Sequence, residues 1–209
     1  MLRAFVVGIN EKIKNDLKNE KTAAELAFLK SQLNPHFLFN TLNNIYVLTY
    51  QKSDKAPAAM LKLSEIMRYM LYESNEPMVD LEHEVKYLSN LIELQKMRYH
   101  GDVFIQANLQ GNFAGKKIAP LLLAPFVENA FKHGDVGDKD NPLEINLLES
   151  QNNVHFSVKN KKRLQNKDEV GGVGMENVKR RLDLLYEGKY SLDIQDDEKL
   201  YYCELNLML

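Results

Sequence analysis

The sequence has little of what disulfide-bonded, zinc-rich or membrane-spanning proteins need. Only one of its 209 residues is a cysteine, Cys203. A lone cysteine excludes an internal disulfide framework and a cysteine-rich zinc site. No apolar run approaches the roughly 20 residues that a membrane-spanning helix requires. The short apolar start, residues 1–9, fits either the inner end of a spanning helix or the beginning of an ordinary helix.

An excess of one charge is also missing. The 27 lysine and arginine residues nearly balance the 29 aspartate and glutamate residues, which leaves a formal net charge of -2. Proteins that bind nucleic acid by neutralising phosphates are usually more basic, so we do not expect direct nucleic-acid binding. Hydrophobic residues make up 44% of the chain. That content is enough to bury a core, and it excludes a wholly disordered chain.

Glycine is nearly absent from the first half, where none occurs between Gly8 and Gly101. Apolar residues there recur at three- and four-residue steps, which predicts three helices, over residues 10–51, 57–73 and 81–99. The first two would form an antiparallel hairpin. Because such a hairpin buries little on its own, we expect either a second copy of the chain, completing a four-helix bundle, or docking onto the rest of the same chain.

The second half changes to alternating patterns that are typical of antiparallel strands with one wet face. An antiparallel sheet with helices packed on one face forms an α+β sandwich. We therefore predict two domains, a helical hairpin over residues 1–77 and an α/β domain over residues 78–209, with a hinge at 73–77. In the second domain we expect strands near 103–109, 143–147, 154–158, 192–194 and 203–209, and helices over 118–133 and 174–186.

Three short motifs could carry chemistry. The first is Leu33–Asn40, in which Pro35 should bend a helix and is followed by His36. Imidazole is mostly neutral near neutral pH and can act as a nucleophile. A lone histidine in a helical bundle can equally serve a structural role, as a hydrogen-bonding side chain.

The second motif is Glu128–Gly134, at the end of a predicted helix. Asn129, Lys132 and His133 are three and four residues apart and would share one side of that helix. An amide oxygen suits Mg²⁺, and a lysine one turn along could meet phosphate oxygens. The alternative is a polar helix end that reaches water.

The third motif is Gly171–Leu182, where Gly172 and Gly174 stand directly before a predicted helix. Glycines let backbone amides approach a phosphate, and the positive end of the helix dipole stabilises the anion. The alternative is a flexible loop. Basic residues follow at positions 179–181, and their simplest interpretation is a solvated face.

In this order and spacing, the motifs Leu33–Asn40, Pro125–Gly134 and Gly171–Leu182 resemble the LytS/YehU-type sensor histidine kinases. The resemblance runs from about Glu25 to the C-terminus. It implies a dimerising phosphoacceptor hairpin, forming a dimeric four-helix bundle. An ATP-binding domain would follow, an α/β sandwich of the Bergerat (histidine kinase/gyrase/Hsp90-like) type.

The resemblance also implies an activity, with His36 as the phosphoacceptor. The reaction would be autophosphorylation from ATP and Mg²⁺, followed by transfer to an aspartate of a response regulator of the LytTR type. The chain would act as a homodimer. It would form the cytoplasmic portion of an inner-membrane sensor kinase whose membrane-spanning region is N-terminal to this chain.

The same resemblance implies which residues contact the nucleotide. Asn129 falls where the family binds Mg²⁺, and Lys132 and His133 fall in the phosphate-facing turn. The glycine box beside the triphosphate corresponds to Gly172 and Gly174.

The chain departs from the family pattern at two positions. One is the residue that binds the adenine amino group, and the other is the residue next to His36 that could act as a general base. Family members usually hold the adenine amino group with an aspartate, for which this chain has Asn160, just before an implied ATP lid at 161–171. An amide oxygen can accept that hydrogen bond without charge, but a degenerate, non-catalytic signalling scaffold is an alternative function.

The residue after His36 is Phe37, so no base is adjacent in sequence. A water-activating ATPase or serine kinase of the same fold would need a glutamate where Pro125 stands, which disfavours that activity.

Overall fold

The computed structural model describes residues 35–74, 76–99, 101–163 and 173–209. The chain forms two compact units, residues 1–39 and 40–209. Within the first unit, the described residues are 35–39. The predicted helical residues 10–34 therefore lie outside the described part of the chain.

Two helices, α2 (Pro35–Tyr50) and α3 (Ala56–Arg68), confirm the predicted helices in the described part of this region. A tight turn separates them, in which Lys52 takes a positive φ of 53°. Pro57 lies in the first turn of α3, where its missing N–H leaves no helical hydrogen bond unmade. The bend at Pro35 stays a prediction, because Pro35 is the first described residue.

The chain leaves α3 through a π-helical turn, η1 (Tyr69–Glu73), whereas the sequence predicted an uninterrupted α-helix to Glu73. The amide of Ser74 donates to the carbonyl oxygen of Tyr69 at 2.9 Å, five residues back. Turns of this kind are rare and occur frequently at functional sites.

A third helix, α4 (Leu81–Lys96), follows the short strand β1 (Val79–Asp80). It ends before the predicted residue 99. Among its buried residues are the apolar ones whose spacing predicted the helix: Val85, Leu88, Leu91, Ile92 and Leu94. None of the helices in the described ranges is both long enough and apolar enough to cross a membrane.

The longer strands form one five-stranded sheet in the order β2-β4-β5-β7-β6. β2 runs parallel to β4, whereas the other neighbours pair antiparallel. The sheet is therefore mixed, and the expectation of an antiparallel sheet is wrong for β2, because a helical crossover between β2 and β4 allows parallel pairing. The strands are β2 (Ile105–Gln110), β4 (Leu143–Ser150), β5 (Asn153–Lys161), β6 (Tyr190–Asp196) and β7 (Leu200–Met208).

β4 and β5 form the hairpin that the alternating pattern predicted. Gln151 and Asn152 connect them with positive φ angles of 51° and 64°. A two-residue turn with both φ angles positive matches the twist of the strands beside it. The alternation on both strands places Ile145, Leu147, Val154, Phe156 and Val158 in the core.

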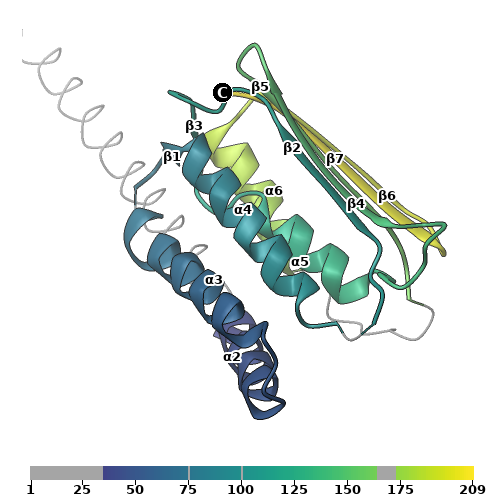
Figure 1. Cartoon of the computed structure of the whole chain (residues 1–209). Coiled ribbons are helices and arrows are strands. Elements are labelled where there is room, and N and C mark those ends of the chain that lie inside the picture. Colours follow the sequence, from purple (N-terminus) through teal and green to yellow (C-terminus); the bar gives the residue numbers. More distant parts are fainter. Residues whose placement is uncertain (1–34, 75, 100, 164–172) are drawn as a thin grey trace, which may run out of the picture. The chain divides into compact units, whose positions relative to one another are not determined.

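Three helices, α4, α5 (Ala124–His133) and α6 (Val173–Leu185), lie on one face of this sheet (Figure 1). The core between the layers includes Phe126 of α5 and Phe156 of β5, whose ring centroids are 5.7 Å apart. The predicted α+β class is confirmed, because the helices and the sheet form a two-layer sandwich.

The predicted helix over 118–133 is wrong in its first part. The short strand β3 (Lys117–Ile118) pairs with β1 instead, and α5 begins only after a buried turn at residues 119–123. Leu121 in this turn has a φ of 56°, in the left-handed region. The residue before a proline disfavours the helical conformation, so Pro120 opposes a helix that starts here.

Candidate functional site

The last turns of α5 carry the second sequence motif. Asn129 and His133 are half-buried there, and Lys132 is exposed. The helix ends at Gly134, whose backbone is extended and whose amide donates to the carbonyl oxygen of Ala130 at 2.7 Å. The helical spacing predicted for the three polar side chains is therefore present at the end of the helix.

Gly134 joins this helix end to the end of β5. A Cβ atom on Gly134 would lie 2.3 Å from the carbonyl oxygen of Ala130 and 3.0 Å from the Cβ of Asn160, so only glycine fits. The amide of Asp135 also donates to the carbonyl oxygen of Lys161 at 2.7 Å. The structure thus brings Asn160 next to the last turn of α5.

Asn160 is buried, with 1% of its surface exposed. Its Nδ2 donates to the carbonyl oxygen of Lys161 at 3.3 Å. Its Oδ1 is also buried and has no hydrogen-bond partner within the described ranges. Leaving a buried acceptor unpaired costs roughly 1–3 kcal/mol, so a ligand that donates a hydrogen bond there is favoured. The amino group of adenine is such a donor, so the buried oxygen is compatible with the role that the resemblance implies for Asn160, and this role stays a prediction.

Tyr201 on β7 lies opposite Asn160 in the sheet, and it is also buried. Burial raises the pKa of its hydroxyl, and the nearby side chain of Asn129 lowers that pKa to a smaller extent. Polar side chains from α5, β5 and β7 therefore share the layer between helices and sheet. No motif pointed to Tyr201, because the pairing register of distant strands is not visible in the sequence.

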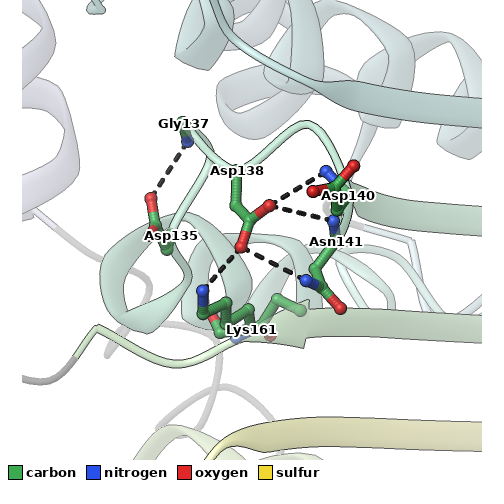
Figure 2. Close-up of polar contacts among 7 residues, drawn as sticks. Asp135, Gly137, Asp138, Asp140, Asn141 and Lys161 are labelled. Atoms are coloured by element: carbon green, nitrogen blue, oxygen red, sulfur yellow. Dashed lines mark hydrogen bonds and ion pairs between the residues drawn. The ribbon is translucent and has the colours of Figure 1, made fainter.

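One carboxylate, that of Asp138, holds the loop that follows α5 (Figure 2). It accepts hydrogen bonds from the Nζ of Lys161 at 2.5 Å and from the Nδ2 of Asn141 at 3.2 Å. The backbone amides of Asp140 and Asn141 donate to its other oxygen. The bond from Lys161, followed by that from Asn141, lowers the pKa of Asp138 to about 2. These contacts tie the loop to the residue beside Asn160.

Tyr99 and Arg163 form a second contact at the same helix end. The hydroxyl of Tyr99 donates to the carbonyl oxygen of Phe131 at 3.0 Å and accepts from the Nη2 of Arg163 at 3.3 Å. The guanidinium carbon of Arg163 lies 5.7 Å from the centre of the Tyr99 ring, a cation–π arrangement. The amide of Arg163 donates to the carbonyl oxygen of His133 at 3.0 Å. Sequence reasoning missed this pair, because neither residue belongs to a motif.

The third motif is described in part. Gly172 lies outside the described residues, as does most of the implied lid, whereas Gly174 is the second residue of α6 and is exposed. A Cβ atom on Gly174 would meet no described atom within 4 Å, so packing does not require glycine there. The expected solvated face at 179–181 is wrong for Arg181, which is buried because its guanidinium donates to carbonyl oxygens of the turn before α5.

His36 lies in the first turn of α2 and belongs to the first compact unit. Its side chain lies outside the described part of the structure. The role of His36 as phosphoacceptor therefore stays a prediction.

Comparison with known proteins shows which proteins the chain is similar to. The model of the histidine kinase family matches residues 24–103. The sensor protein LytS of Oceanobacillus iheyensis is 30% identical over 205 residues, which cover 90% of this chain and 34% of that protein. The chain is similar to the LytS-type histidine kinases over most of its length. The sensor histidine kinase/phosphatase LytS of Staphylococcus aureus is 29% identical over 157 residues, which cover 74% of this chain and 27% of that protein.

The chain spans about a third of the length of the curated relatives that it matches. Among solved structures, the histidine kinase domain of a blue-light activated kinase from Erythrobacter litoralis overlaps with a TM-score of 0.47 at 12% identity, over 91% of this chain and 96% of that one. That score is too low to support conclusions about chemistry. The family match includes His36 and ends before α5, so the candidate nucleotide contacts depend on the geometry described above.

Proposed function

We propose that this chain is the kinase region of a two-component sensor. In this function His36 accepts the γ-phosphoryl group of ATP and passes it to an aspartate of a response regulator. The observation that carries the proposal is the buried Oδ1 of Asn160 beside the end of α5, which has no hydrogen-bond partner among the described residues. The match to the histidine kinase family model and the similarity to LytS support it.

ATP with Mg²⁺ would supply the phosphoryl group. Different residues are suited to bind its adenine, its Mg²⁺ ion and its phosphate groups. Asn160 would accept a hydrogen bond from the adenine amino group. The amide oxygen of Asn129 would bind Mg²⁺, which prefers oxygen ligands. Lys132 and His133 at the end of α5, together with the first amides of α6, would meet phosphate oxygens.

The orientation of the Asn160 amide bears on which purine is bound. Because its Nδ2 is hydrogen-bonded to the carbonyl oxygen of Lys161, its Oδ1 is the atom left to meet a base. An acceptor favours adenine, which presents an amino group, over guanine, which presents a carbonyl oxygen at the same ring position. An aspartate here would instead set one of its oxygens against the Lys161 carbonyl, which is unfavourable.

We therefore expect Mg·ATP to bind more tightly than Mg·GTP, and Asn160→Ala to weaken Mg·ATP binding by about three- to tenfold. Isothermal titration calorimetry measures both affinities. Asn108→Ala removes an exposed amide from β2 and serves as the matched control, with an unchanged affinity expected. Equal affinity for ATP and GTP would contradict the assigned role of Asn160.

The chemical step at His36 would be a direct displacement. A neutral imidazole keeps a lone pair on one ring nitrogen, which can attack in line. The bond from that nitrogen to the γ-phosphorus forms as the bond from phosphorus to the bridging oxygen of ADP breaks, and the ring then loses its remaining N–H proton. Phe37 is apolar and cannot take that proton, so a group elsewhere or water must accept it.

Incubation of the chain with Mg·ATP labelled at the γ-phosphate tests this activity. We expect an acid-labile, alkali-stable phosphoprotein, and we expect His36→Gln to abolish the label. A label that persists in His36→Gln would refute the phosphoacceptor assignment. Steady release of phosphate from His36→Gln would instead indicate a water-activating ATPase.

The proposal includes the partners and the domain division. A phosphoacceptor hairpin over residues 1–77 would precede the ATP-binding domain over 78–209. The exposed apolar side chains of α2 and α3 support a homodimer that covers them. A response regulator of the LytTR type, and a place on the cytoplasmic side of an inner-membrane sensor, follow from the resemblance alone.

A second candidate function is a non-catalytic dimeric scaffold of the same fold. It is favoured by the amide of Asn160 at a position where the family usually has an aspartate. Calorimetry that shows no heat of binding for a folded chain at millimolar Mg·ATP would support the scaffold. A measurable affinity together with a labelled His36 would exclude it.

A further inference from the structure

The hydrogen bonds around Glu84 lie outside every motif in the sequence. Glu84 is on α4, and its side chain is fully buried. Its Oε2 accepts from the amide of Leu121 at 2.9 Å, and its Oε1 accepts from the amide of Leu123 at 3.5 Å. A buried carboxylate is tolerated only when it is hydrogen-bonded, so these bonds hold Glu84 and the turn at 119–123 together.

Arg181 of α6 holds the same turn through its carbonyl groups. Its side chain is 3% exposed, and it donates from Nη2 to the carbonyl oxygen of Pro120 at 2.5 Å and from Nη1 to that of Leu121 at 3.3 Å. Leu121 thus has its N–H bound to Glu84 and its C=O bound to Arg181. Its φ of 56° is a conformation that leucine adopts only against steric resistance. Glu84 and Arg181 therefore hold a strained turn that leads directly into α5.

Tyr69 connects this turn to the second helix of the hairpin. It is the first residue of η1, and its hydroxyl donates to the Oε2 of Glu84 at 2.5 Å. Burial and the adjacent Glu84 carboxylate raise the pKa of Tyr69, so the phenol keeps its proton and remains a donor. A continuous series of hydrogen bonds therefore runs from η1 through Glu84 to the turn before α5, and from that turn through Arg181 to α6.

Other polar contacts between α3–η1 and α4 in the described part of the chain are more exposed than the bond from Tyr69 to Glu84. Glu65 accepts from Asn90 at 2.8 Å and lies 3.4 Å from the Nζ of Lys86. Glu73 lies 3.2 Å from the ring of His83. The pairs Lys86–Glu65 and His83–Glu73 each have an exposed partner and contribute little stability. Polar contacts between parts of a chain also commonly allow relative motion. The buried bond from Tyr69 to Glu84 is the link that such motion would break.

We infer that Glu84 is a positioning residue through which the state of the hairpin reaches the nucleotide site. While Tyr69 donates to Glu84, the strained turn is held, and α5 and α6 keep the spacing that their phosphate contacts need. When the hairpin moves and this bond breaks, Glu84 holds the amide of Leu121 less firmly, and the contacts to nucleotide loosen. The identity of the ligand rests on the proposed function, whereas the coupling through hydrogen bonds does not.

Tyr69→Phe in the full chain tests this coupling, because it removes only the hydroxyl. Tyr87→Phe is the matched control, since its ring is a buried neighbour with a centroid 4.9 Å from that of Tyr69 and its hydroxyl is not hydrogen-bonded to Glu84. Hydrogen exchange is measured by NMR at the amides of Leu121 and Leu123. Nucleotide affinity is measured by calorimetry with the Mg²⁺ complex of a non-hydrolysable ATP analogue.

We expect Tyr69→Phe to speed exchange at these two amides by about tenfold or more and to weaken nucleotide binding by about three- to tenfold, with neither change in Tyr87→Phe. Coupling between sites is reciprocal, so saturating nucleotide should slow exchange at the amide of Ser74, which closes η1. Unchanged exchange at Leu121 and Leu123 would overturn the inference. Faster exchange with unaltered nucleotide affinity would overturn it as well.

The two proposals fail in different ways. If the wild-type chain binds no nucleotide, the proposed function is wrong, and the exchange comparison alone decides whether Tyr69 and Glu84 hold the turn. If Tyr69→Phe does not fold, Arg181→Lys replaces it, because lysine keeps the charge but lacks the fork that reaches two carbonyl oxygens. A folded Arg181→Lys chain with wild-type exchange at Leu121 would then contradict the inference.

Discussion

α3 and α4 pack against each other, but they bury very different shares of their side chains. α4 is buried over much of its surface, because it contacts α3 on one side and α5 on another. α3 buries little beyond Ala59, Leu63 and Ile66, and its Met60 and Leu61 are 50% and 63% exposed. α4 is therefore a core helix of the folded chain, whereas α3 presents an apolar surface.

α2 shares this property with α3. Its Leu42, Tyr46 and Tyr50 are exposed, and the rings of the two tyrosines stack with centroids 6.4 Å apart. Large apolar side chains gathered on neighbouring helices mark surfaces that another molecule covers. The comparison teaches that the side chains of α4 stabilise the fold, whereas the proposed dimer interface lies on α2 and α3.

The largest expected effect is a difference in the free energy of unfolding between a variant of α4 and a variant of α3. Leu91 on α4 is fully buried, so Leu91→Ala should lower the free energy of unfolding by about 2–5 kcal/mol. Leu61→Ala on α3 should change it by about 0.5 kcal/mol or less, because an exposed side chain loses few contacts. Urea unfolding at a concentration where the chain is monomeric measures both changes. Similar losses in the two variants would show that α3 is not the exposed helix.

An intermediate effect concerns assembly. Leu61→Asp should weaken dimerisation by about tenfold or more, because it would bury a charge in the proposed helix bundle. Ser64→Asp places the same charge at an exposed polar position of the same helix and serves as the control. Sedimentation equilibrium measures the dissociation constant. A chain that is monomeric before substitution, or a dimer that Leu61→Asp leaves intact, would remove α3 from the interface.

The smallest expected effect is a pH dependence of stability that arises in the loop after α5. The pKa of Asp138 is lowered to about 2, whereas an unfolded aspartate titrates near about 3.9. A lowered pKa in the folded state stabilises the fold above the unfolded value, and this contribution is lost as the pH falls from about 4 towards 2. The melting temperature of the wild type should therefore fall more steeply in this window than that of Asp138→Asn.

Lys161→Met is the companion variant for this prediction, because it removes the largest cause of the shift. Its melting profile should be flattened over the same window. Parallel profiles for the wild type and both variants would mean that the ion pair in Figure 2 does not stabilise the loop.

Much of the secondary structure followed from local patterns. The β4–β5 hairpin was predicted because alternating residues mark one buried face, and its turn residues confirm this. The helix over 118–133 was wrong at its start because the turn at 119–123 depends on distant partners. Glu84 is 37 residues from Leu121, and Arg181 is 60 residues from it. Local spacing contains no signal for bonds of that length.

The candidate site also has features that the sequence predicts and features that it does not. The spacing of Asn129, Lys132 and His133 on one helix could be read from the sequence, since helical geometry is local. The burial of Tyr201 and the contact between Tyr99 and Arg163 could not, because they join elements that are remote in the chain.

By itself the sequence determined the class of fold, the order of the longer helices and strands, and the three motifs that resemble those of LytS-type kinases, because periodicity and motif spacing act over a few residues. Only the tertiary structure decided that Arg181 is buried, that Oδ1 of Asn160 has no partner in the described part of the chain, and that α3 stays exposed. Burial and hydrogen bonding depend on which elements pack against each other in the folded chain, and local sequence patterns do not specify this packing.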